Sequence, residues 1–466
     1  MIQLAGSIVF IIGILVLFAL DRDKGTRASK ALWIPVVWLF LAGSRPVSFW
    51  LQMRMIGTSA DDQLEGSPLD RAIFTALIVA ALVVLAARGR KVGKLLQANG
   101  PILLFLFYCG LSSIWSDFPD VAFKRWIRVV GDFAMVSVVL TDPGISVAVE
   151  RFLARTGSII IPLSILFDIG RWFSGRGWHY GLTLNKNMYG AISMILGLGA
   201  VWRFLTMFRN GEREGRTRRL IARGSIVGMA MWCLWMADSA TSTACFLLGS
   251  MLIIVTSSRL LRQRPAVVHL VVASLVLLAV YVTIINPAVG VVSTMGKDPT
   301  LTGRTELWQA LIPMTPSTWF GAGFESFWLG PRLKKLWSIF VWQPNEAHNG
   351  YVEVYLNLGL TGLILLAVVL VTGYWRVVSG IRQDSAAGSL SLAYFVVAVV
   401  YSLTEVGFRI FNPIWIFFLL SITGVVKPQL ENAKLQPLNI VSWPFAESRF
   451  STRDSDSAVE EVDRVR

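Results

Sequence analysis

Apolar runs of about 17 to 25 residues recur along the whole chain, and each is long enough to cross a bilayer core of roughly 30 Å as a helix. Inside a bilayer the backbone N–H and C=O groups must be paired within the protein, so only helices and closed β-barrels span it. The alternating strands of a barrel are absent from the sequence. The sequence therefore predicts an all-α fold, a polytopic integral membrane helix bundle.

The composition agrees with a membrane protein and disfavours a nucleic-acid-binding one. Hydrophobic residues make up 54% of the chain and charged residues 15%, whereas a soluble domain is about one quarter charged. The formal net charge is +14, but the cations are spread over short loops without a nucleic-acid-binding motif, so we expect no nucleic-acid partner. Cys109, Cys233 and Cys245 lie in apolar runs without metal-ligand spacing, which predicts neither a disulfide nor a zinc site.

The apolar runs predict about 12 to 13 transmembrane helices. The predicted spans cover residues 3–20, 31–50, 70–87, 101–115, 126–141, 152–169, 188–207, 222–238, 241–257, 266–285, 350–374, 388–404 and 411–426. Lysines and arginines of the short loops collect on one side, which marks the cytoplasm. The densest cluster lies between Arg209 and Arg223, and residues 88–94 and 376–382 share its side. Because each span takes the chain to the other side of the membrane, this distribution of cations places the long loop before residue 350 outside the cytoplasm.

The spans divide the chain into four predicted parts. An N-terminal transmembrane bundle covers residues 1–285, one large periplasmic loop covers 286–349, and C-terminal transmembrane helices cover 350–426. Residues 427–466 lose the hydrophobic pattern, and a segment that buries so little apolar surface cannot offset its ordering entropy. We expect this tail to be cytoplasmic and mostly disordered.

Three charged residues form a stripe at the outer end of the predicted span 126–141. Arg125, Arg128 and Asp132 are spaced at i, i+3 and i+7, which places them on one face of a helix. Arginine binds a phosphate or diphosphate through paired, charge-assisted hydrogen bonds. The alternative is that the arginines anchor the helix at the membrane interface while Asp132 neutralises Arg128. Both interpretations stay open at this point.

A second polar group precedes the predicted span 188–207. Asn185, Lys186 and Asn187 offer hydrogen-bond donors that suit sugar hydroxyls or a phosphate. The alternative is that an asparagine caps the helix and Lys186 anchors it at the interface. His179 has an aromatic neighbour on each side, which fits an interfacial belt better than catalysis.

The long outer loop carries the groups best suited to catalysis. Arg304 falls in the first turn of a helix predicted to begin at Thr302, where a cation opposes the helix dipole and therefore suggests ligand binding. His348 precedes a long apolar helix, and a neutral imidazole can take a proton from a hydroxyl group. Asn349 and Glu353 follow on one face of that helix. Alone, His348 would be interpreted as a helix-start residue, but these polar neighbours favour a catalytic role.

The short outer turn between the last two predicted spans adds Glu405, Arg409 and Asn412. These residues either contribute to the same outer cavity or pair with one another. The full set of predicted substrate-binding residues is Arg304, Arg125, Arg128, Lys186, Asn187, Asn349, Glu353 and Arg409.

Short motifs in and just after the outer loop resemble the signature of the O-antigen ligase and Wzy-type polymerase superfamily. They are Thr302-Gly-Arg-Thr305 with Leu307-Trp308, Gly321-x-Gly323-Phe324, Ala347-His348-Asn349-x-Tyr351-x-Glu353, and Gly359-x-x-Gly362. Two upstream segments also resemble this family, Gly181-x-Thr183-x-Asn185-Lys186-Asn187-x-x-Gly190 and Asp238-Ser239-x-Thr241-Ser242-Thr243. Members often carry His-Lys-Asn at the first of these, so no histidine role transfers there. The ending Glu405-x-x-x-Arg409-x-x-Asn412 is most similar to the exopolysaccharide-production polymerases.

The resemblance implies a GT-C-like glycosyltransferase of a bacterial inner membrane, with its active site facing the periplasm. Its donor would be a glycan on undecaprenyl diphosphate, and its acceptor a hydroxyl of another lipid-linked repeat unit or of lipid A core. The implied reaction is inverting and needs no metal or cofactor. His348 would act as general base, with Arg304, Arg125 and Arg128 on the diphosphate. A flippase and a chain-length regulator of the same pathway are the implied protein partners, within the lipid bilayer.

The preferred function is polymerisation of lipid-linked repeat units into exopolysaccharide, and two alternatives remain. The first is a ligase that transfers a finished glycan to lipid A core or to a protein. The second is a transporter of lipid-linked sugars, which the unequal outer loop and the lack of paired broken spans disfavour.

Overall fold

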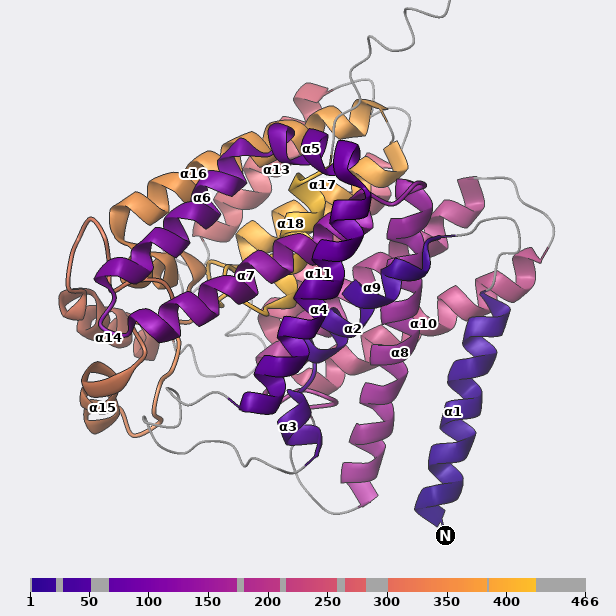
Figure 1. The fold of residues 1–466 in the computed structure, drawn as a ribbon. Helices are drawn as coiled ribbons and strands as arrows, with labels where there is room; N and C mark the ends of the chain where they lie inside the picture. Colours follow the sequence, from indigo (N-terminus) through magenta and orange to yellow (C-terminus); the bar gives the residue numbers. More distant parts are fainter. Residues whose placement is uncertain are drawn as a thin grey trace, which may run out of the picture. The chain divides into compact units, whose positions relative to one another are not determined.

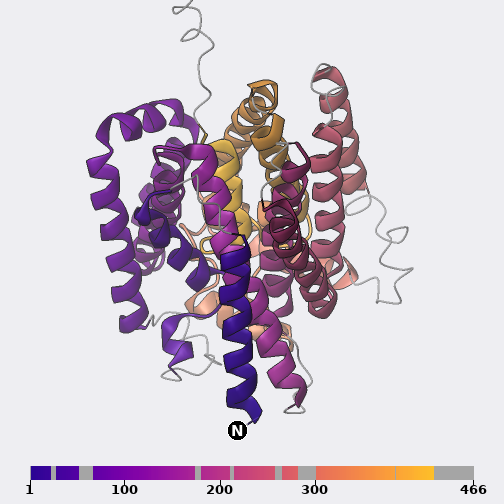
Figure 2. The ribbon, with the colours of Figure 1, turned by 90° about the vertical axis from the view of Figure 1, so that its right-hand side faces the viewer.

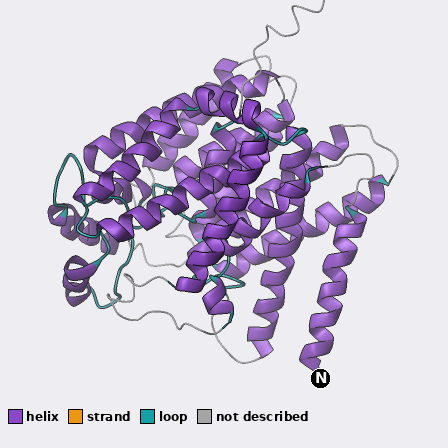
Figure 3. Ribbon diagram, viewed as in Figure 1, coloured by secondary structure: helices purple, strands orange, loops and turns teal. Residues whose placement is uncertain are grey.

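The computed structural model describes residues 2–21, 28–51, 67–173, 180–209, 215–257, 265–281, 301–383 and 385–424. Every regular element within them is a helix (Figure 3), which confirms the predicted all-α fold. The described residues belong to one compact unit, Met1–Val426. The predicted tail 427–466, His179 and the first part of the outer loop, up to residue 300, lie outside the described residues.

The helices follow the predicted spans closely (Figure 1). In chain order they are α1 (Ile2–Leu20), η1 (Lys30–Leu32), α2 (Trp33–Ala42), α3 (Val47–Trp50), α4 (Pro68–Ala87), α5 (Gly89–Ala98), α6 (Gly100–Leu111), η2 (Ser112–Trp115), α7 (Pro119–Leu140), α8 (Ile145–Phe173), α9 (Lys186–Arg209), α10 (Arg216–Ala237), α11 (Ala240–Thr256), α13 (Pro265–Val280), α14 (Leu301–Leu311), η4 (Ile312–Met314), α15 (Gly330–Ile339), α16 (Gly350–Gln383), α17 (Ser385–Tyr401) and α18 (Pro413–Ile422). The prediction of one continuous span over residues 31–50 is wrong, because this segment contains two helices. Helix α2 ends before Gly43, and α3 begins after Pro46.

Several helices are long and apolar enough to cross a membrane. Among the described residues five meet that test, α4, α8, α9, α10 and α16, and α5 with α6 would form a sixth span bent by 86°. Shorter apolar stretches of 10–17 residues occur in α1, α2, α11, α13, α17 and α18. The chain is therefore a multi-pass membrane protein, whereas the number of about 12 to 13 spans stays a prediction.

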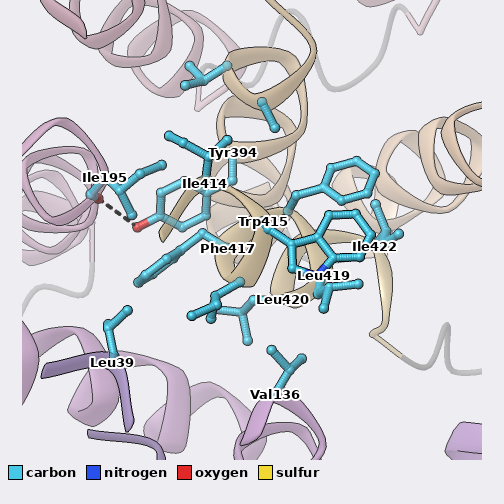
Figure 4. Close-up of a cluster of buried hydrophobic side chains, with 14 of the residues drawn as sticks. Leu39, Val136, Ile195, Tyr394, Ile414, Trp415, Phe417, Leu419, Leu420 and Ile422 are labelled. Atoms are coloured by element: carbon cyan, nitrogen blue, oxygen red, sulfur yellow. Dashed lines mark hydrogen bonds between the residues drawn. The ribbon is translucent and has the colours of Figure 1, made fainter. Parts of the chain in front are cut away.

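Helix α18 forms the centre of the main core. All of its residues are buried, as expected for a helix that is apolar on every side. It packs against α7, α9, α16 and α17. Figure 4 shows Phe417 of α18 beside Tyr394 of α17, whose hydroxyl donates to the Ile195 carbonyl of α9 at 3.1 Å. This packing fixes the position of the polar turn 402–412 that leads into α18.

Helix α16 is broken at Gly359, where φ is +66°. The outer loop bonds the backbone groups that follow the break: Leu360 N–H donates to the Thr318 carbonyl at 2.9 Å, and Thr361 N–H to the Trp319 carbonyl at 3.1 Å. A Cβ atom on Gly359 would lie 2.3 Å from that Trp319 carbonyl. The loop and the first turns of α16 therefore form one unit, in which the irregular backbone is paired within the protein.

The outer loop also has a small apolar core of its own. Leu307 of α14, Leu333 of α15 and Leu356 of α16 are each 0% exposed within it. This core attaches α14 and α15, at the left of Figure 1, to the start of α16. It thereby holds Arg304, on α14, and His348, two residues before α16, in fixed positions.

A buried group of ion pairs attaches α1 to the bundle. Asp21, directly after α1, pairs with Arg203 of α9 at 2.5 Å and with Arg223 of α10 at 3.1 Å, and Arg223 also pairs with Glu150 of α8 at 2.6 Å. Figure 2 shows α1 along the near side of the bundle, where it packs against α8. Two acids and two guanidinium groups balance one another: Asp21, Arg203 and Arg223 are buried, and the Glu150 side chain, 37% exposed, supplies the second negative charge.

Candidate functional site

Glu405 gathers three of the predicted site residues around one carboxylate. It lies in the turn after α17 and is 5% exposed. Its Oε1 accepts from Arg304 Nη2 at 3.0 Å, while its Oε2 accepts from Asn187 Nδ2 at 2.9 Å and lies 3.3 Å from His348 Nδ1. Arg304 also donates to the Thr404 carbonyl at 2.6 Å. We refer to Asn187, Arg304, His348 and Glu405 as the Glu405 cluster; its members come from four distant parts of the chain.

Two further carboxylates lie beside this cluster. Glu346 Oε1 is 3.3 Å from His348 Nδ1, and Glu346 Oε2 is 3.6 Å from Arg409 Nη1. Arg409 in turn pairs through Nε with Glu325 Oε2 at 3.2 Å. The side chain of Arg409 is 27% exposed, whereas that of Glu325 is 6% exposed. Arg409 therefore connects the Glu405 cluster to the outer loop that carries Glu325.

Arg125 and Arg128 of α7 contact other parts of the same region. Arg125 Nη1 donates to the backbone carbonyl of Glu325. The Arg128 guanidinium lies 5.5 Å from the ring centroid of Phe411, a position that favours cation–π attraction. Asp132 accepts from an indole N–H of α2 at 2.8 Å and from the Phe411 N–H at 3.3 Å. Among the described residues no ion pair joins Asp132 to Arg128, so the interpretation in which one neutralises the other loses its geometric basis.

A cavity of about 420 Å³ opens beside these groups. Arg128, Glu346 and Arg409 line it, and apolar side chains of α2 and α4 contribute to its wall. His348 adjoins the cavity through Glu346, whereas Arg125 and Arg304 are not part of its wall. The wall also carries the carboxylates of Asp70 and Glu346, so the cavity combines two guanidinium groups, two carboxylates and apolar side chains, a lining that suits an amphipathic ligand with a polar head group.

The backbone at His348 adopts a conformation that is rare for a non-glycine residue, with φ at +48°. Ala347, the residue before it, is held through both of its backbone polar groups: its N–H donates to Glu353 Oε2 at 3.0 Å, and its carbonyl accepts from Trp308 Nε1 at 2.8 Å. Glu325 shares the left-handed conformation, with φ at +53°. Such strain persists where the surroundings over-determine it, and it is frequent at binding and catalytic sites.

Asn349 and Glu353 lie inside the protein rather than at an open surface. Asn349 is 5% exposed and caps α16, because its Oδ1 accepts from two backbone N–H groups at 2.9 and 3.0 Å. Glu353 is 2% exposed, and its Oε1 accepts from Trp328 Nε1 at 2.7 Å. These bonds engage their polar atoms within the protein. Both residues are therefore better interpreted as supports for the turn that carries His348 than as the substrate contacts expected of them.

The three polar residues at the start of α9 do not share one role. Asn185 caps the helix, since its Oδ1 accepts from the Met188 N–H at 2.8 Å, whereas Asn187 belongs to the Glu405 cluster. Lys186 is exposed, and the described contacts do not connect it to that cluster. Its substrate-binding role stays a prediction.

The charges around His348 determine its protonation. Burial alone would lower the pKa of the imidazole, but the hydrogen bond with Glu405 and the charges of Glu346 and Glu405 outweigh it, so the pKa is raised above its ordinary value of 6.5. In the neutral form Nδ1 carries the proton, because the carboxylates that face it can only accept. Nε2 then holds the lone pair and is the atom that can take a proton.

Glu346, His348 and Glu405 also offer three possible metal ligands within 4.8 Å of one another. The carboxylates are already paired with guanidinium groups, Glu405 with Arg304 and Glu346 with Arg409. A divalent cation in the same place would be repelled by both arginines. A metal ion bound here would have to displace Arg304 from Glu405 and Arg409 from Glu346.

Sequence reasoning missed two contributors to this region. Glu325 was not among the candidates, although an acidic residue directly after a glycine-rich motif in an outer loop was an available signal. The hydroxyl motif of α11 was noted without a role, and Thr241 Oγ1 lies 3.1 Å from Thr404 Oγ1. That contact supports the turn carrying Glu405.

Comparison with known proteins gives a family match and a relative of known pathway. Residues 224–367, which include Arg304 and His348, match the family model described as O-antigen ligase. Over 288 residues the chain is 28% identical to the exopolysaccharide production protein ExoQ of Rhizobium meliloti (strain 1021). That match covers 59% of this chain and 64% of the relative, so it spans less than two thirds of that protein. The family match and the similarity to an exopolysaccharide production protein support the predicted resemblance to the O-antigen ligase and Wzy-type polymerase superfamily, and the apolar helices make this chain a multi-pass membrane protein.

Proposed function

We propose that this protein is a glycosyltransferase that joins lipid-linked oligosaccharide repeat units into exopolysaccharide on the periplasmic face of the inner membrane. The observation that carries the proposal is the meeting of Asn187, Arg304 and His348 at Glu405, beside a cavity lined by two more arginines. The imidazole supplies a general base, and the guanidinium groups stabilise a departing anion. Similarity to an exopolysaccharide production protein supports this product class.

The donor in this proposal is a glycan on undecaprenyl diphosphate, held in the cavity. Arg128 and Arg409 bind the diphosphate oxygens through charge-assisted hydrogen bonds, and the apolar wall accommodates the start of the lipid. Arg125 and Arg304 add positive charge to the same region from outside the cavity wall. Arg304 is paired with Glu405, and Arg409 with Glu325 and Glu346, so in this proposal the diphosphate takes over part of these ion pairs when it binds.

The acceptor is a sugar hydroxyl of a second lipid-linked glycan. Nε2 of His348 takes the hydroxyl proton while the hydroxyl oxygen forms a bond to the anomeric carbon of the donor. The bond between that carbon and the diphosphate oxygen breaks, and its electron pair leaves with undecaprenyl diphosphate. Attack opposite the leaving group inverts the anomeric configuration. The arginines neutralise the leaving group, so this scheme uses no metal ion.

Reconstitution with an undecaprenyl-diphosphate oligosaccharide tests the proposal. We expect wild-type protein to form products longer by one repeat unit, with or without a metal chelator, and His348→Ala to form none. His269→Ala is the matched control, because His269 bonds to the Tyr374 hydroxyl of α16 at 2.7 Å and is outside the Glu405 cluster. Wild-type product from His348→Ala would remove this residue from the mechanism.

The same assay separates the alternatives. A ligase would transfer the glycan to lipid A core and would not lengthen the lipid-linked chain. A lipid-linked sugar transporter would move substrate across the vesicle membrane without forming a glycosidic bond. A flippase and a chain-length regulator of the same pathway are the proposed partners, and their addition should change product length without replacing the requirement for His348.

A further inference from the structure

Trp342 is a large aromatic side chain that the fold leaves uncovered next to the proposed base. It is 52% exposed, and its ring centroid lies 6.1 Å from that of His348, with 38° between the two ring planes. The preceding residue, Val341, is 97% exposed. An indole in water forgoes the free energy of burial. Single exposed aromatic residues are common on protein surfaces, and the contact with the proposed base is what sets Trp342 apart as a surface for a ligand.

The turn that carries Trp342 is fixed by several contacts. Gln343 has φ at +51°, and its N–H donates to the Phe340 carbonyl at 3.0 Å. Pro344 is buried, and its carbonyl accepts from Trp337 Nε1 at 2.9 Å. The Phe340 ring packs edge-on against Trp342, with centroids 5.9 Å apart. The backbone that carries the indole is therefore held in one conformation, which lowers the entropic cost of binding a ligand on it.

Trp342 and the arginine-lined cavity are separate surfaces that meet at His348. Glu346 lines the cavity and lies 3.3 Å from His348 Nδ1, whereas Trp342 is not part of the cavity wall. The imidazole thus has the cavity residue as one neighbour and the indole as another. A reaction between two substrates needs this arrangement, because the base must touch the acceptor while the donor occupies the cavity.

We propose that Trp342 is the platform on which the acceptor sugar ring stacks, with one hydroxyl of that ring directed at Nε2 of His348. This inference rests on the proposed function and specifies its acceptor site. A pyranose ring presents C–H groups on its faces, which pack against an aromatic ring, while the hydroxyls at its edge stay free for hydrogen bonds. Asn345 and Glu346, directly after the turn, belong to the wall of the cavity, so the platform adjoins the proposed donor site through them.

Binding of the soluble repeat-unit oligosaccharide, released from its lipid by mild acid, tests the platform without requiring turnover. In calorimetric titration of the full-length protein in lipid nanodiscs, we expect Trp342→Ala to weaken binding about tenfold. Trp342→Phe should retain most of the affinity, because a phenyl ring also stacks. With the lipid-linked acceptor, Trp342→Ala should raise the acceptor KM more than it lowers kcat.

Trp319→Ala is the matched control, since Trp319 is 57% exposed in the same outer loop and, among the described ring contacts, none joins it to His348. It should bind the oligosaccharide like wild type. Equal loss from both alanine variants, or wild-type affinity in Trp342→Ala, would refute the platform. Weaker membrane association of Trp342→Ala with unchanged sugar affinity would also refute it and would identify an interfacial anchor. Thermal unfolding of each variant checks that it is folded.

The platform and the transferase proposal fail under different results. His348→Ala should still bind the oligosaccharide through Trp342, more weakly than wild type because it loses the contact with one hydroxyl, although it transfers nothing. If the wild-type protein binds sugar through Trp342 but never forms a glycosidic bond, the transferase proposal fails and the sugar site stands. If Trp342→Ala transfers repeat units with an unchanged acceptor KM, the platform fails and the transferase proposal stands.

Discussion

The contact between His348 and Glu405 is the residue-level feature on which the proposed chemistry depends. The carboxylate lies 3.3 Å from Nδ1 and thereby determines which ring nitrogen carries the proton. It also bonds Arg304 and Asn187, so a change at Glu405 affects three members of the cluster together. Because Glu405 is 5% exposed, these interactions are screened less than they would be in water.

Glu405→Gln should move the pH dependence of transfer toward acid. Only neutral His348 accepts a proton, and its pKa is raised because burial, which lowers it, is outweighed by the Glu405 hydrogen bond and the nearby carboxylate charges. The rate therefore falls as the pH drops through that raised pKa. Glutamine removes one negative charge, which lowers the pKa, so the acid limb of kcat/KM should shift to lower pH.

Two observations check this pH prediction. Glu306 is an exposed carboxylate on α14, so Glu306→Gln should leave the acid limb where it is in the wild-type protein. An acid limb that does not move in Glu405→Gln would mean that the titrating base is not His348. The plateau rate of Glu405→Gln should also fall, because Arg304 loses its ionic partner.

Arg304→Lys should lower kcat/KM by at least about tenfold although it keeps the charge. The Arg304 guanidinium donates to the Thr404 carbonyl at 2.6 Å and to Glu405 at 3.0 Å with two different nitrogens. A lysine ammonium is a single point of charge and cannot reproduce this fork. Arg332→Lys is the matched control, because Arg332 pairs with the half-exposed Asp117 at 2.7 Å. Comparable activity in both variants would argue against the fork.

The sequence indicated several single site residues but not their pairing. Arg304, His348 and Arg409 were candidates because they are charged or titratable in segments expected outside the membrane. Asn187 meets Glu405 across 218 positions of the chain, and no local pattern encodes such a contact. The exposure of Trp342 could not be predicted from the sequence either, since the burial of a side chain depends on how the outer loop folds.

At the level of elements, the break in α16 positions the outer loop against the membrane helices. Hydropathy predicted a continuous span over residues 350–374, because glycine is tolerated within transmembrane helices. The φ of +66° at Gly359 depends on the loop segment 318–319 that packs there, and the apolar pattern gives no sign of it. Element positions were therefore predictable from hydropathy, whereas the interruption was not.

Gly359→Ala should destabilise the protein by about 2 kcal/mol or more, because φ is +66° there and a Cβ atom would lie 2.3 Å from the Trp319 carbonyl. Gly380→Ala is the control on the same helix, since a Cβ atom there meets nothing within 4 Å. Thermal unfolding in detergent measures both variants. Gly359→Ala should unfold at a lower temperature, whereas Gly380→Ala should match or exceed the wild type. If Gly359→Ala and Gly380→Ala unfold at the same temperature, the outer loop shifts to make room for the added Cβ atom and the prediction is wrong.

At the scale of the whole molecule, the central question is on which side of the membrane the Glu405 cluster lies. The charge parity of the loops predicts the periplasm for the outer loop and the cytoplasm for α5. The all-α bundle itself followed from the apolar runs, but side of insertion is a property of loop charge rather than of packing. It needs a test that does not depend on activity.

Cysteine labelling provides that test, because Cys109, Cys233 and Cys245 are all buried and should react little. Val341→Cys places a thiol at a position that is 97% exposed, in the turn next to Trp342. A membrane-impermeant maleimide should label it in intact spheroplasts. Lys91→Cys, at an exposed position of α5, should react only after the membrane is opened. The reverse pattern would place His348 in the cytoplasm, where a periplasmic polymerisation reaction is impossible.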